Sequence, residues 1–335
     1  MRADVGPHSI YNGTPDMNEE LLKVIVSKRE IQGDGVVVLD LTRPDGGPLP
    51  VFEAGAHVDI YVAPGLIRQY SLCGDPANAA VYRLGVLKDP ASRGGSTGVH
   101  EVLLEGTEVT ISAPRNHFPL ATQVTRSILI GGGIGITPMI AMAYALQADG
   151  QDFELHYCAR SHSSTAFLNE LQSADFASRV SVHFDDEAAA QKLDLNAVLG
   201  TSKAGVHVYT CGPAGFMDWV IATALEVGYA DAQIHREYFQ VEVDVSGESF
   251  EVVAARSGKT VQVAAGQTIL EALAGVGIKI EISCEQGVCG TCVCDVLEGE
   301  PDHRDVYLTD DEKADNDQIL VCCSRAKSKK LVLDI

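Results

Sequence analysis

The sequence contains no run of roughly 18 apolar residues, the length that a membrane-spanning helix needs, so we expect no transmembrane segment. Residues 1–19 lack the apolar core of a signal peptide, and we expect a flexible polar arm there. Basic residues are scarce, because 25 Lys and Arg stand against 46 Asp and Glu and give a formal net charge of −21. This balance argues against nucleic acid as a partner, since its phosphates would be repelled. It suits a protein partner with a basic patch, and equally an ordinary acidic protein.

Cysteines are unevenly distributed along the chain. Nine are present, and all but three of them lie between residues 284 and 335. In the absence of a secretion signal, such clustering favours a metal or iron–sulfur site over disulfides. It also favours a cytoplasmic location.

Three segments with different apolar patterns follow the arm. Residues 20–123 contain short alternating strands separated by Pro, Gly and Asp turns, which predicts a closed antiparallel β-barrel. Residues 124–232 alternate between strands and helices, which predicts an α/β domain with a parallel sheet. After a linker at 233–244, residues 245–335 combine a hairpin, a short capped helix and further strands, which predicts an α+β domain.

Several elements can be placed from the pattern alone. Thr137 is expected to be the N-cap of a helix, with Pro138 at its first position. The other expected helices lie at 96–104, from 212 to about 228, from Thr268 and from Thr309. Strands are expected at 22–26, 36–41, 57–62, 68–72, 82–87, 108–112, 127–130, 153–158, 180–184, 206–210, 249–254, 260–263, 293–297, 319–323 and 330–333.

The cysteine spacing is the most specific signal. Cys284, Cys289 and Cys292 form a C-x4-C-x2-C loop, and Cys322 follows on a distant strand. This is the plant-type 2Fe–2S pattern, in which three thiolates wrap one side of the cluster and a remote segment supplies the fourth. A tetrahedral zinc site is the alternative, although it would more naturally use two C-x2-C pairs. Spacing alone does not decide between Cys322 and its neighbour Cys323.

Two turns of the second segment are typical of nucleotide binding. Gly132, Gly133 and Gly135 lie between a strand and a helix, where backbone N–H groups can bind a pyrophosphate. Because Ile136 occupies the final position of the G-x-G-x-x-G motif, a simple tight turn is the alternative. Residues 211–213, Cys-Gly-Pro, follow a later strand, at the edge where ligands bind in open α/β sheets.

The barrel segment carries two candidate sites for a phosphorylated ligand. Arg68 and Tyr70 are expected on one face of a strand, where a cation and an aromatic ring could hold a flat phosphorylated molecule. Residues 93–96, Arg-Gly-Gly-Ser, precede a short helix and form a second candidate phosphate site. Solvated surface side chains are the alternative for either motif by itself.

The order of these motifs resembles the phthalate dioxygenase reductase family, the NADH-dependent partners of Rieske-type oxygenases, which includes vanillate demethylase-type reductases. The resemblance runs from about residue 20 to the end of the chain. It rests on residues 68–72, 93–96, 114–120, 132–139, 211–213, 235–239, the cysteine loop and 322–326. It implies an FMN-binding barrel, an NAD-binding α/β domain and a C-terminal β-grasp ferredoxin domain at 245–335.

The resemblance also implies the cofactor-binding residues. Those for FMN are Arg68, Gln69, Tyr70, Ser71, Leu87, Lys88, Gly94, Gly95, Ser96, Thr137 and Phe239. Those for NAD are Gly132, Gly133, Gly135, Pro138, Arg160, Cys211, Gly212 and Pro213. In the family the last cluster ligand precedes x-Ser-Arg-Ala, which selects Cys322 beside Cys284, Cys289 and Cys292. Because Arg160 could also meet a 2′-phosphate, NADPH is the alternative to NADH.

The implied function is electron transfer from NADH through FMN and a 2Fe–2S cluster to the terminal oxygenase, one electron at a time. We expect no essential side-chain acid or base in the hydride step, with Thr137 and Cys211 lying near the flavin and the nicotinamide. A stand-alone NAD(P)H reductase for another acceptor is the alternative function. A redox sensor is a third, although it would not need both a flavin and a nicotinamide site. Asp310, Asp311 and Glu312 could dock a basic partner, or simply form a solvated helix.

Overall fold

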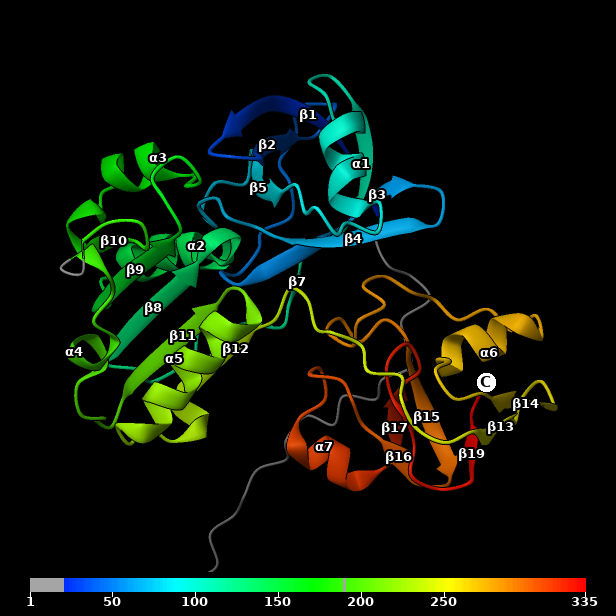
Figure 1. The fold of residues 1–335 in the computed structure, drawn as a ribbon. Coiled ribbons are helices and arrows are strands. Elements are labelled where there is room, and N and C mark those ends of the chain that lie inside the picture. The colour runs from blue at the N-terminus through cyan, green and yellow to red at the C-terminus, as the bar shows by residue number, and fades with distance from the viewer. Residues whose placement is uncertain (1–20, 189–190) are drawn as a thin grey trace, which may run out of the picture.

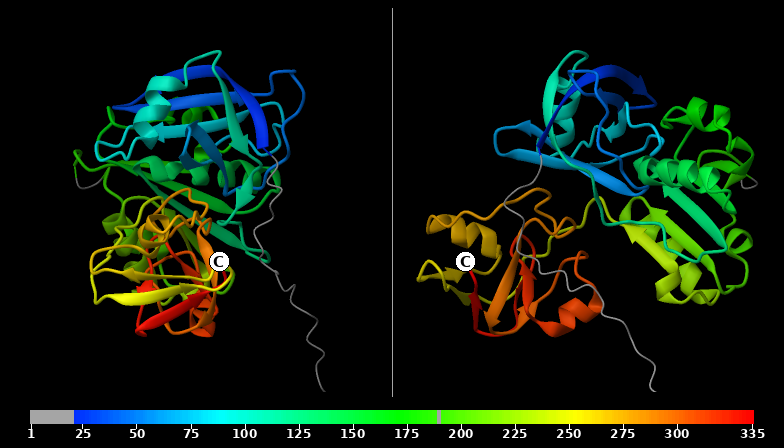
Figure 2. Two further views of the ribbon diagram at one scale, coloured as in Figure 1. Left: turned by 90° about the vertical axis from the view of Figure 1, so that its right-hand side faces the viewer. Right: turned by 180° about the vertical axis from the view of Figure 1, so that it is seen from behind.

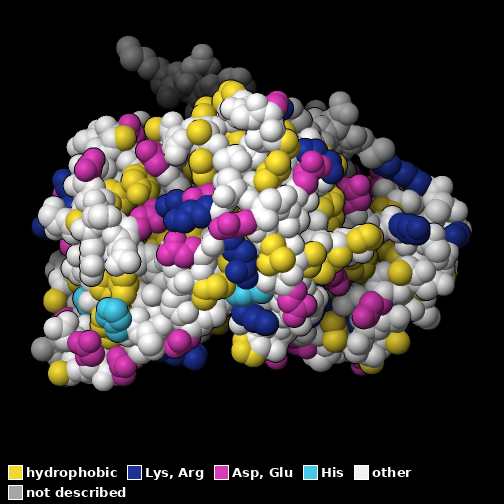
Figure 3. All heavy atoms as spheres, turned by 90° about the horizontal axis from the view of Figure 1, so that it is seen from above, with side chains coloured by type: hydrophobic (Ala, Val, Ile, Leu, Met, Phe, Trp, Pro, Cys, Tyr) yellow, Lys and Arg dark blue, Asp and Glu magenta, His cyan; other side chains and the backbone are white. Residues whose placement is uncertain are grey.

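The computed structural model describes residues 21–188 and 191–335, so the arm expected at 1–19 lies outside the described residues. Figure 1 shows three bodies built around three main sheets, which follow one another along the chain. Within the described residues, no helix is long and apolar enough to cross a membrane. The face seen in Figure 3 mixes cationic and anionic side chains, so the excess of acidic residues is not gathered there.

The first body is an antiparallel barrel, as the sequence predicts. Its strands run in the order β4-β3-β6-β1-β2-β5, and β7 pairs with β3. An isolated bridge between Leu72, next to β4, and Leu84 of β5 joins the two ends of this order and closes the barrel. The elements are β1 (Leu21–Gln32), β2 (Val36–Thr42), β3 (Ala56–Ala63), β4 (Leu66–Ser71), β5 (Tyr82–Leu87), α1 (Gly95–Val102), β6 (Glu108–Ser112) and β7 (Arg115–Asn116).

The second body is a parallel sheet with the order β10-β9-β8-β11-β12. Alternation along β8 explains its two covered faces, because Leu129 packs with α2 and the barrel, whereas Ile128 and Ile130 pack with α4 and α5. The elements are β8 (Arg126–Gly132), α2 (Ile136–Ala148), β9 (Phe153–Ala159), α3 (Leu168–Ser173), β10 (Val180–Phe184), α4 (Leu195–Leu199), β11 (Val206–Cys211), α5 (Ala214–Glu226) and β12 (Ile234–Glu237).

The order of this sheet fixes where a ligand can bind. The chain runs outward from β8 to β9 and β10, then returns to place β11 on the other side of β8. The carboxyl ends of β8 and β11 therefore border the switch point, the usual ligand crevice of an open α/β sheet. Both candidate nucleotide turns follow these two strands.

The start of α2 corrects one prediction. Helix α2 begins at Ile136, with Gly135 before it, so Thr137 is not the N-cap. The reason is a turn of 3₁₀-helix at Gly133–Gly135 that runs directly into α2. From the first turn of α2, the Thr137 hydroxyl donates back to the carbonyl of Ile134 in the 3₁₀ turn at 3.0 Å.

The third body is a β-grasp domain with the order β14-β13-β19-β15-β17, in which α6 packs across the sheet through Ile269 and Leu273. Capping boxes start α6 at Thr268 and α7 at Thr309, as predicted. The elements are β13 (Phe250–Ala254), β14 (Lys259–Val263), α6 (Ile269–Gly275), β15 (Val293–Glu298), β16 (Pro301–Asp302), α7 (Asp310–Asp315), β17 (Gln318–Leu320), β18 (Arg325–Ala326) and β19 (Lys330–Leu333). The strand expected at 319–323 ends at Leu320, because residues 321–323 form a turn.

Candidate functional site

The four cysteines predicted as cluster ligands lie in the third body, and all of them are buried. Their thiols lie in two close pairs: Cys284 lies beside Cys289, and Cys292 lies beside Cys322. The contact with the Cys284 thiol lowers the pKa of Cys289 below its ordinary value, which favours the thiolate that binds metals.

The pairing of the thiols helps to distinguish a 2Fe–2S cluster from a zinc ion. Among the described residues, no group of three His, Cys, Asp or Glu side chains could hold a metal ion. A structural zinc ion needs four ligands around a single centre. A 2Fe–2S cluster has two irons, each held by two cysteines, so two thiol pairs fit it better.

Two glycines let the loop fold closely around these thiols. Gly287 and Gly290 have φ angles of +73° and +75°, a region that side chains rarely adopt. A Cβ at Gly287 would lie 2.5 Å from the sulfur of Cys323, and one at Gly290 would lie 2.2 Å from the Tyr307 ring. Side chains at either position would therefore displace the segment that lies against the loop.

Cys323 has different surroundings from Cys322. Its sulfur lies 3.8 Å from the carbonyl oxygen of Leu320 and 3.7 Å from the hydroxyl of Ser324. It also hydrogen-bonds to the thiol of Cys322. Cys322 is thus the member of the pair that meets Cys292, whereas the Cys323 sulfur lies against Gly287 of the loop.

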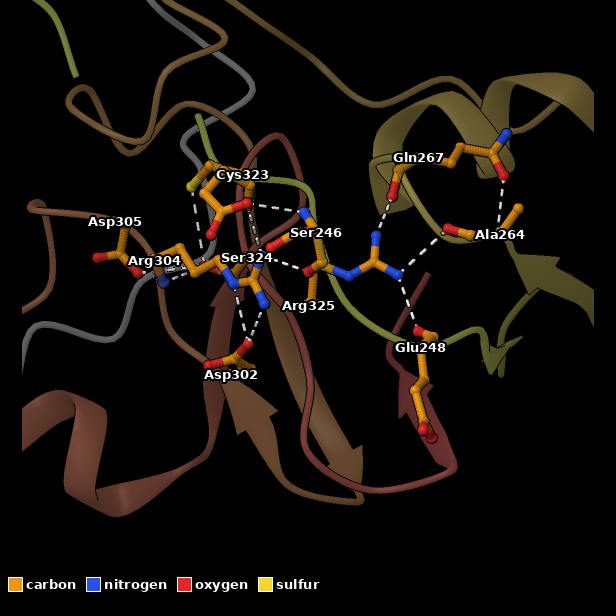
Figure 4. Close-up of polar contacts among 11 residues, drawn as sticks. Ser246, Glu248, Ala264, Gln267, Asp302, Arg304, Asp305, Cys323, Ser324 and Arg325 are labelled. Atoms are coloured by element: carbon orange, nitrogen blue, oxygen red, sulfur yellow. Dashed lines mark hydrogen bonds and ion pairs between the residues drawn. The ribbon is translucent and has the colours of Figure 1, made fainter. Parts of the chain in front are cut away.

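Arg325 anchors the segment that carries Cys322. Its side chain is only 1% exposed, and its guanidinium donates to backbone carbonyls of Glu248 at 2.9 Å, Ala264 at 3.2 Å and Gln267 (Figure 4). The guanidinium also lies 5.1 Å from the centre of the Phe250 ring. Three carbonyls and a ring satisfy a buried cation that would otherwise be costly.

Ser324 links the same segment to the chain that covers the cysteine loop. Its hydroxyl donates to Asp305 at 3.3 Å and accepts from the backbone N–H of Arg304 at 3.1 Å (Figure 4). The guanidinium of Arg304 in turn donates to Asp302 at 2.6 Å. These bonds hold residues 302–305 in place beside the candidate ligands.

On the barrel, Arg68 and the glycine turn before α1 come together. A Cβ at Gly95 would lie 2.5 Å from the Arg68 side chain, so Arg68 packs directly on the turn. Its guanidinium donates to the carbonyl oxygens of Ile67 at 2.7 Å, Arg93 at 3.2 Å and Ser283 at 3.2 Å. The strand motif and the Arg-Gly-Gly-Ser motif thus form one cationic region.

Other residues predicted to bind FMN are placed around this region. Gly94 is the left-handed N-cap of α1, and the Ser96 hydroxyl accepts from the N–H of Asp89 at 3.1 Å. The Gln69 amide meets a ring nitrogen of His57 at 3.4 Å. The side chains of Leu87 and Lys88, by contrast, are exposed at the end of β5.

Ser71, Cys211 and Glu237 meet where the barrel touches the parallel sheet. The hydroxyl of Ser71 donates to the Glu237 carboxyl at 3.3 Å, and the buried Cys211 thiol interacts electrostatically with that carboxyl. Burial of the carboxyl raises the pKa of Glu237 to about 8. The sequence analysis missed Glu237 as a site residue, although it lies in the 235–239 motif.

Thr137, Tyr70 and Phe239 border the same contact. A Cβ at Gly85 of β5 would lie 3.1 Å from a Thr137 methyl group, so this part of α2 lies against the barrel. Burial raises the pKa of Tyr70 above its ordinary value, and both Tyr70 and Phe239 pack against the shared core.

The two turns predicted to bind NAD are in direct contact. A Cβ at Gly135 would lie 2.2 Å from the carbonyl oxygen of Cys211, and Gly132 and Gly212 both pack against the Phe216 ring. Pro213 immediately precedes α5. Arg160 lies apart from these turns, after β9, where its carbonyl accepts from Asp186 at 3.1 Å. Pro138 is buried within α2, and Gly133 has a φ of +55° with open space around it.

The cationic region of the barrel contacts the cysteine loop directly. Arg93 donates to the carbonyl oxygen of Cys284 at 2.6 Å, and Arg68 donates to that of the preceding Ser283 at 3.2 Å. The rings of His117 and Tyr307 meet edge to face beside them, with centres 5.5 Å apart. Figure 2 shows the loop directly beneath the barrel in both views.

Comparison with known proteins agrees with this architecture. Residues 252–327 match the 2Fe–2S iron–sulfur cluster binding domain, and residues 112–234 match the N-terminal domain of dimethylamine monooxygenase subunit DmmA-like proteins. The chain is 53% identical to vanillate O-demethylase oxidoreductase of Pseudomonas sp. strain HR199, covering 94% of this chain and 100% of that one. It is 41% identical to phthalate dioxygenase reductase of Burkholderia cepacia, covering 96% and 99%.

Solved structures give the same picture. A phthalate dioxygenase reductase, described as a modular structure for electron transfer from pyridine nucleotides to 2Fe–2S, matches with a TM-score of 0.73 and 39% identity over 94% of this chain and 98% of that one. An intact type IV self-sufficient cytochrome P450 monooxygenase matches with a TM-score of 0.82 and 38% identity, covering 94% of this chain and 41% of that one.

The surroundings of the neighbouring cysteines generate a prediction. We expect Cys322→Ser to lose the visible iron–sulfur absorbance and the bound iron, because the thiol that meets Cys292 is removed. Cys323→Ser should keep both. Iron analysis and visible absorbance of the two purified variants test this prediction. Loss of iron and absorbance in Cys323→Ser, with both retained in Cys322→Ser, would make Cys323 the ligand.

The close approach at Gly135 generates a second prediction. Gly135→Ala should raise the KM for NADH about tenfold or more, because its Cβ would push the Cys211 turn away from the crevice. Gly215→Ala in the adjacent α5 is the matched control, since a Cβ there meets nothing within 4 Å. Steady-state NADH oxidation with ferricyanide measures both, and an equal KM in the two variants would contradict the prediction.

The buried carboxyl generates a third prediction. The folded pKa of Glu237, about 8, lies above its ordinary value of 4.5, so its contribution to stability is complete below about 4.5 and is lost as the pH rises through about 8. The melting temperature of the holoprotein should therefore fall as the pH rises toward about 8. It should fall less steeply for Glu237→Gln. Identical slopes for the two proteins between about pH 6 and 9 would refute the assignment.

Proposed function

This chain belongs to the phthalate dioxygenase reductase family of NADH-dependent flavin and iron–sulfur oxidoreductases, and we propose that its own partner is the terminal component of a Rieske-type oxygenase or demethylase. The contact between Arg93 and Cys284 carries the proposal, because it brings the candidate flavin-phosphate region against the first candidate cluster ligand. A reductase that transfers electrons from a flavin in one module to a cluster in another needs the two sites to be close together.

In this proposal, separate groups of residues bind FMN, NADH and the 2Fe–2S cluster. Arg68 and the N–H groups of residues 94–96 hold the FMN phosphate, while Thr137 and Phe239 border the flavin ring. The Gly132–Gly135 turn holds the pyrophosphate of NADH, and residues 211–213 position its nicotinamide. The two thiol pairs hold a 2Fe–2S cluster. When bound, FMN accepts a hydride from NADH and releases electrons singly, as the cluster requires.

The oxygenase is best sought among aromatic O-demethylases. The identity to vanillate O-demethylase oxidoreductases is 53%, 46% and 41%, against 39% to 42% for carnitine monooxygenase reductase subunits and 41% for phthalate dioxygenase reductase. A reductase recognises its oxygenase through its surface, so the most similar reductases are the best guide to the partner. We also infer a cytoplasmic location, which suits nine cysteines that are all free.

A haem acceptor is the second candidate. Two cytochrome P450 monooxygenases carry a reductase portion that matches 94% of this chain with 38% and 40% identity. Reconstitution with either a vanillate-type oxygenase or a P450 haem domain distinguishes the two. Product formation only with the haem domain would overturn the oxygenase proposal.

The acidic start of α7 is the proposed docking surface. Residues 305–309 run from the cysteine loop to this helix: the Val306 N–H donates to the Gly287 carbonyl at 3.1 Å, and α7 then begins with Asp310, Asp311 and Glu312. These exposed carboxylates lie one short segment from the candidate cluster. They can steer a basic face of the oxygenase toward the cysteine loop.

This placement predicts a specific salt dependence. Raising the ionic strength from about 0.05 to 0.3 M should slow oxygenase-coupled NADH oxidation several-fold, because exposed charges are screened over this range. The NADH–ferricyanide rate should stay constant. Asp310→Asn with Asp311→Asn should slow the coupled rate at low salt, whereas neutralising the exposed Glu30 on the barrel should not. Equal salt effects on both assays would reject the docking surface.

A further inference from the structure

A partly buried ion pair of the barrel lies beneath the cysteine loop. Asp59 of β3 is 3% exposed, and its carboxylate accepts a 2.6 Å bond from the guanidinium of Arg115 on β7. Neither residue belongs to the candidate FMN or NAD sites. The Ser283 side chain, next to Cys284, lies beside the Asp59 carboxylate, so the pair is at the module boundary.

Both charges of this pair act on Cys289. The Asp59 carboxylate and the Arg115 guanidinium each interact electrostatically with this thiol, and the His117 ring, two residues after Arg115, meets the Tyr307 ring of the other module with centres 5.5 Å apart. Arg115 also interacts with Tyr307, the ring that covers Gly290. The pair therefore faces the candidate cluster across the boundary, although its members are more than 150 residues away in sequence.

The Asp59–Arg115 pair is the main source of charge on this part of the barrel, because the side chains next to it are neutral. His57 and His117 flank it, and burial lowers the pKa of both below the ordinary value of 6.5, so both imidazoles are neutral near pH 7. Gln69 is uncharged. The other charged groups near the loop are Arg68, Arg93 and Glu285, which contact residues 283–285, and the buried Asp305, which lies against Gly287 and 4.0 Å from the Lys313 ammonium.

We propose that the Asp59–Arg115 pair of the barrel sets the reduction potential of the iron–sulfur cluster in the neighbouring module. This inference rests on the proposed cluster at Cys284, Cys289, Cys292 and Cys322. One-electron reduction adds one negative charge to the cluster and breaks no bond. Arg115 stabilises that added charge, and Asp59 limits the effect while holding the guanidinium in place. Because Asp59 is buried and Arg115 is partly buried, water and salt screen the pair less than they screen a fully exposed pair.

The two members of the pair must have effects of opposite sign. Removing the positive charge makes the reduced cluster less favourable and lowers its midpoint potential. Removing the negative charge leaves the Arg115 charge uncompensated and raises the midpoint potential. A merely structural role would shift both variants in the same direction, or neither, so the sign of the shift separates an electrostatic effect from lost packing.

The experiment is a reductive titration of the full-length holoprotein, followed by the EPR signal of the reduced cluster. We expect Arg115→Gln to lower the midpoint potential and Asp59→Asn to raise it, each by about 59 mV, a tenfold change in a one-electron equilibrium constant. The shifts should persist at high salt. The double variant Asp59→Asn/Arg115→Gln should lie close to wild type.

The barrel offers a matched control in a second arginine–aspartate pair. Arg83 donates to Asp40 at 2.7 and 3.0 Å, and it also pairs with Glu170 of the parallel-sheet body, on a contact away from the cysteine loop. Arg83→Gln and Asp40→Asn should leave the cluster potential unchanged. If Arg115→Gln does not fold, comparing the double variant with Asp59→Asn still isolates the loss of the Arg115 charge.

The possible failures are distinguishable. If wild-type protein shows no iron–sulfur EPR signal, the proposed cluster itself is wrong. If the cluster is present but the Asp59 and Arg115 variants shift together, or no more than the Arg83 and Asp40 controls, the inference is overturned. Shifts of opposite sign confined to the Asp59–Arg115 pair support it.

Discussion

The polar contact between the barrel and the cysteine loop is the interaction on which the functional arrangement depends. Arg68 and Arg93 donate to the successive carbonyls of Ser283 and Cys284, so two charge-assisted hydrogen bonds fix the loop beside the glycine turn of α1. The same arginines border the candidate phosphate site. A ligand bound at this turn would therefore lie beside the arginines that hold the loop.

Close backbone approach plays the corresponding role between the barrel and the parallel sheet. Gly135 lies against the Cys211 turn with no room for a side chain, and Ser71 reaches across to Glu237. The chain thereby brings a residue of the candidate flavin site and the two candidate nicotinamide turns to one contact region. Because a backbone contact cannot relax as a long side chain can, this geometry is rigid where reacting rings must be held in register.

Local pattern was enough to predict much of this molecule from its sequence. Strand alternation gave the barrel, the Thr268 and Thr309 capping boxes marked two helix starts, and the cysteine spacing singled out one loop. The Thr137 cap was wrong because a 3₁₀ turn, invisible to propensity, moves the helix start to Ile136. Glu237 and Arg115 were missed because their significance comes from partners far away in sequence. The domain limits and cofactor ligands stay predictions.

The two kinds of contact near the cysteine loop differ in the desolvation free energy that they require. Arg93 is partly exposed, so its bond to Cys284 requires little desolvation and can form and break easily. Asp59 is buried and Arg115 is partly buried, so desolvation offsets part of the Coulombic attraction between them. Such a pair contributes little net free energy to the stability of the fold. Its position beneath a candidate redox centre gives a physical reason to keep it, since a buried charge acts across a module boundary with little screening by water or salt.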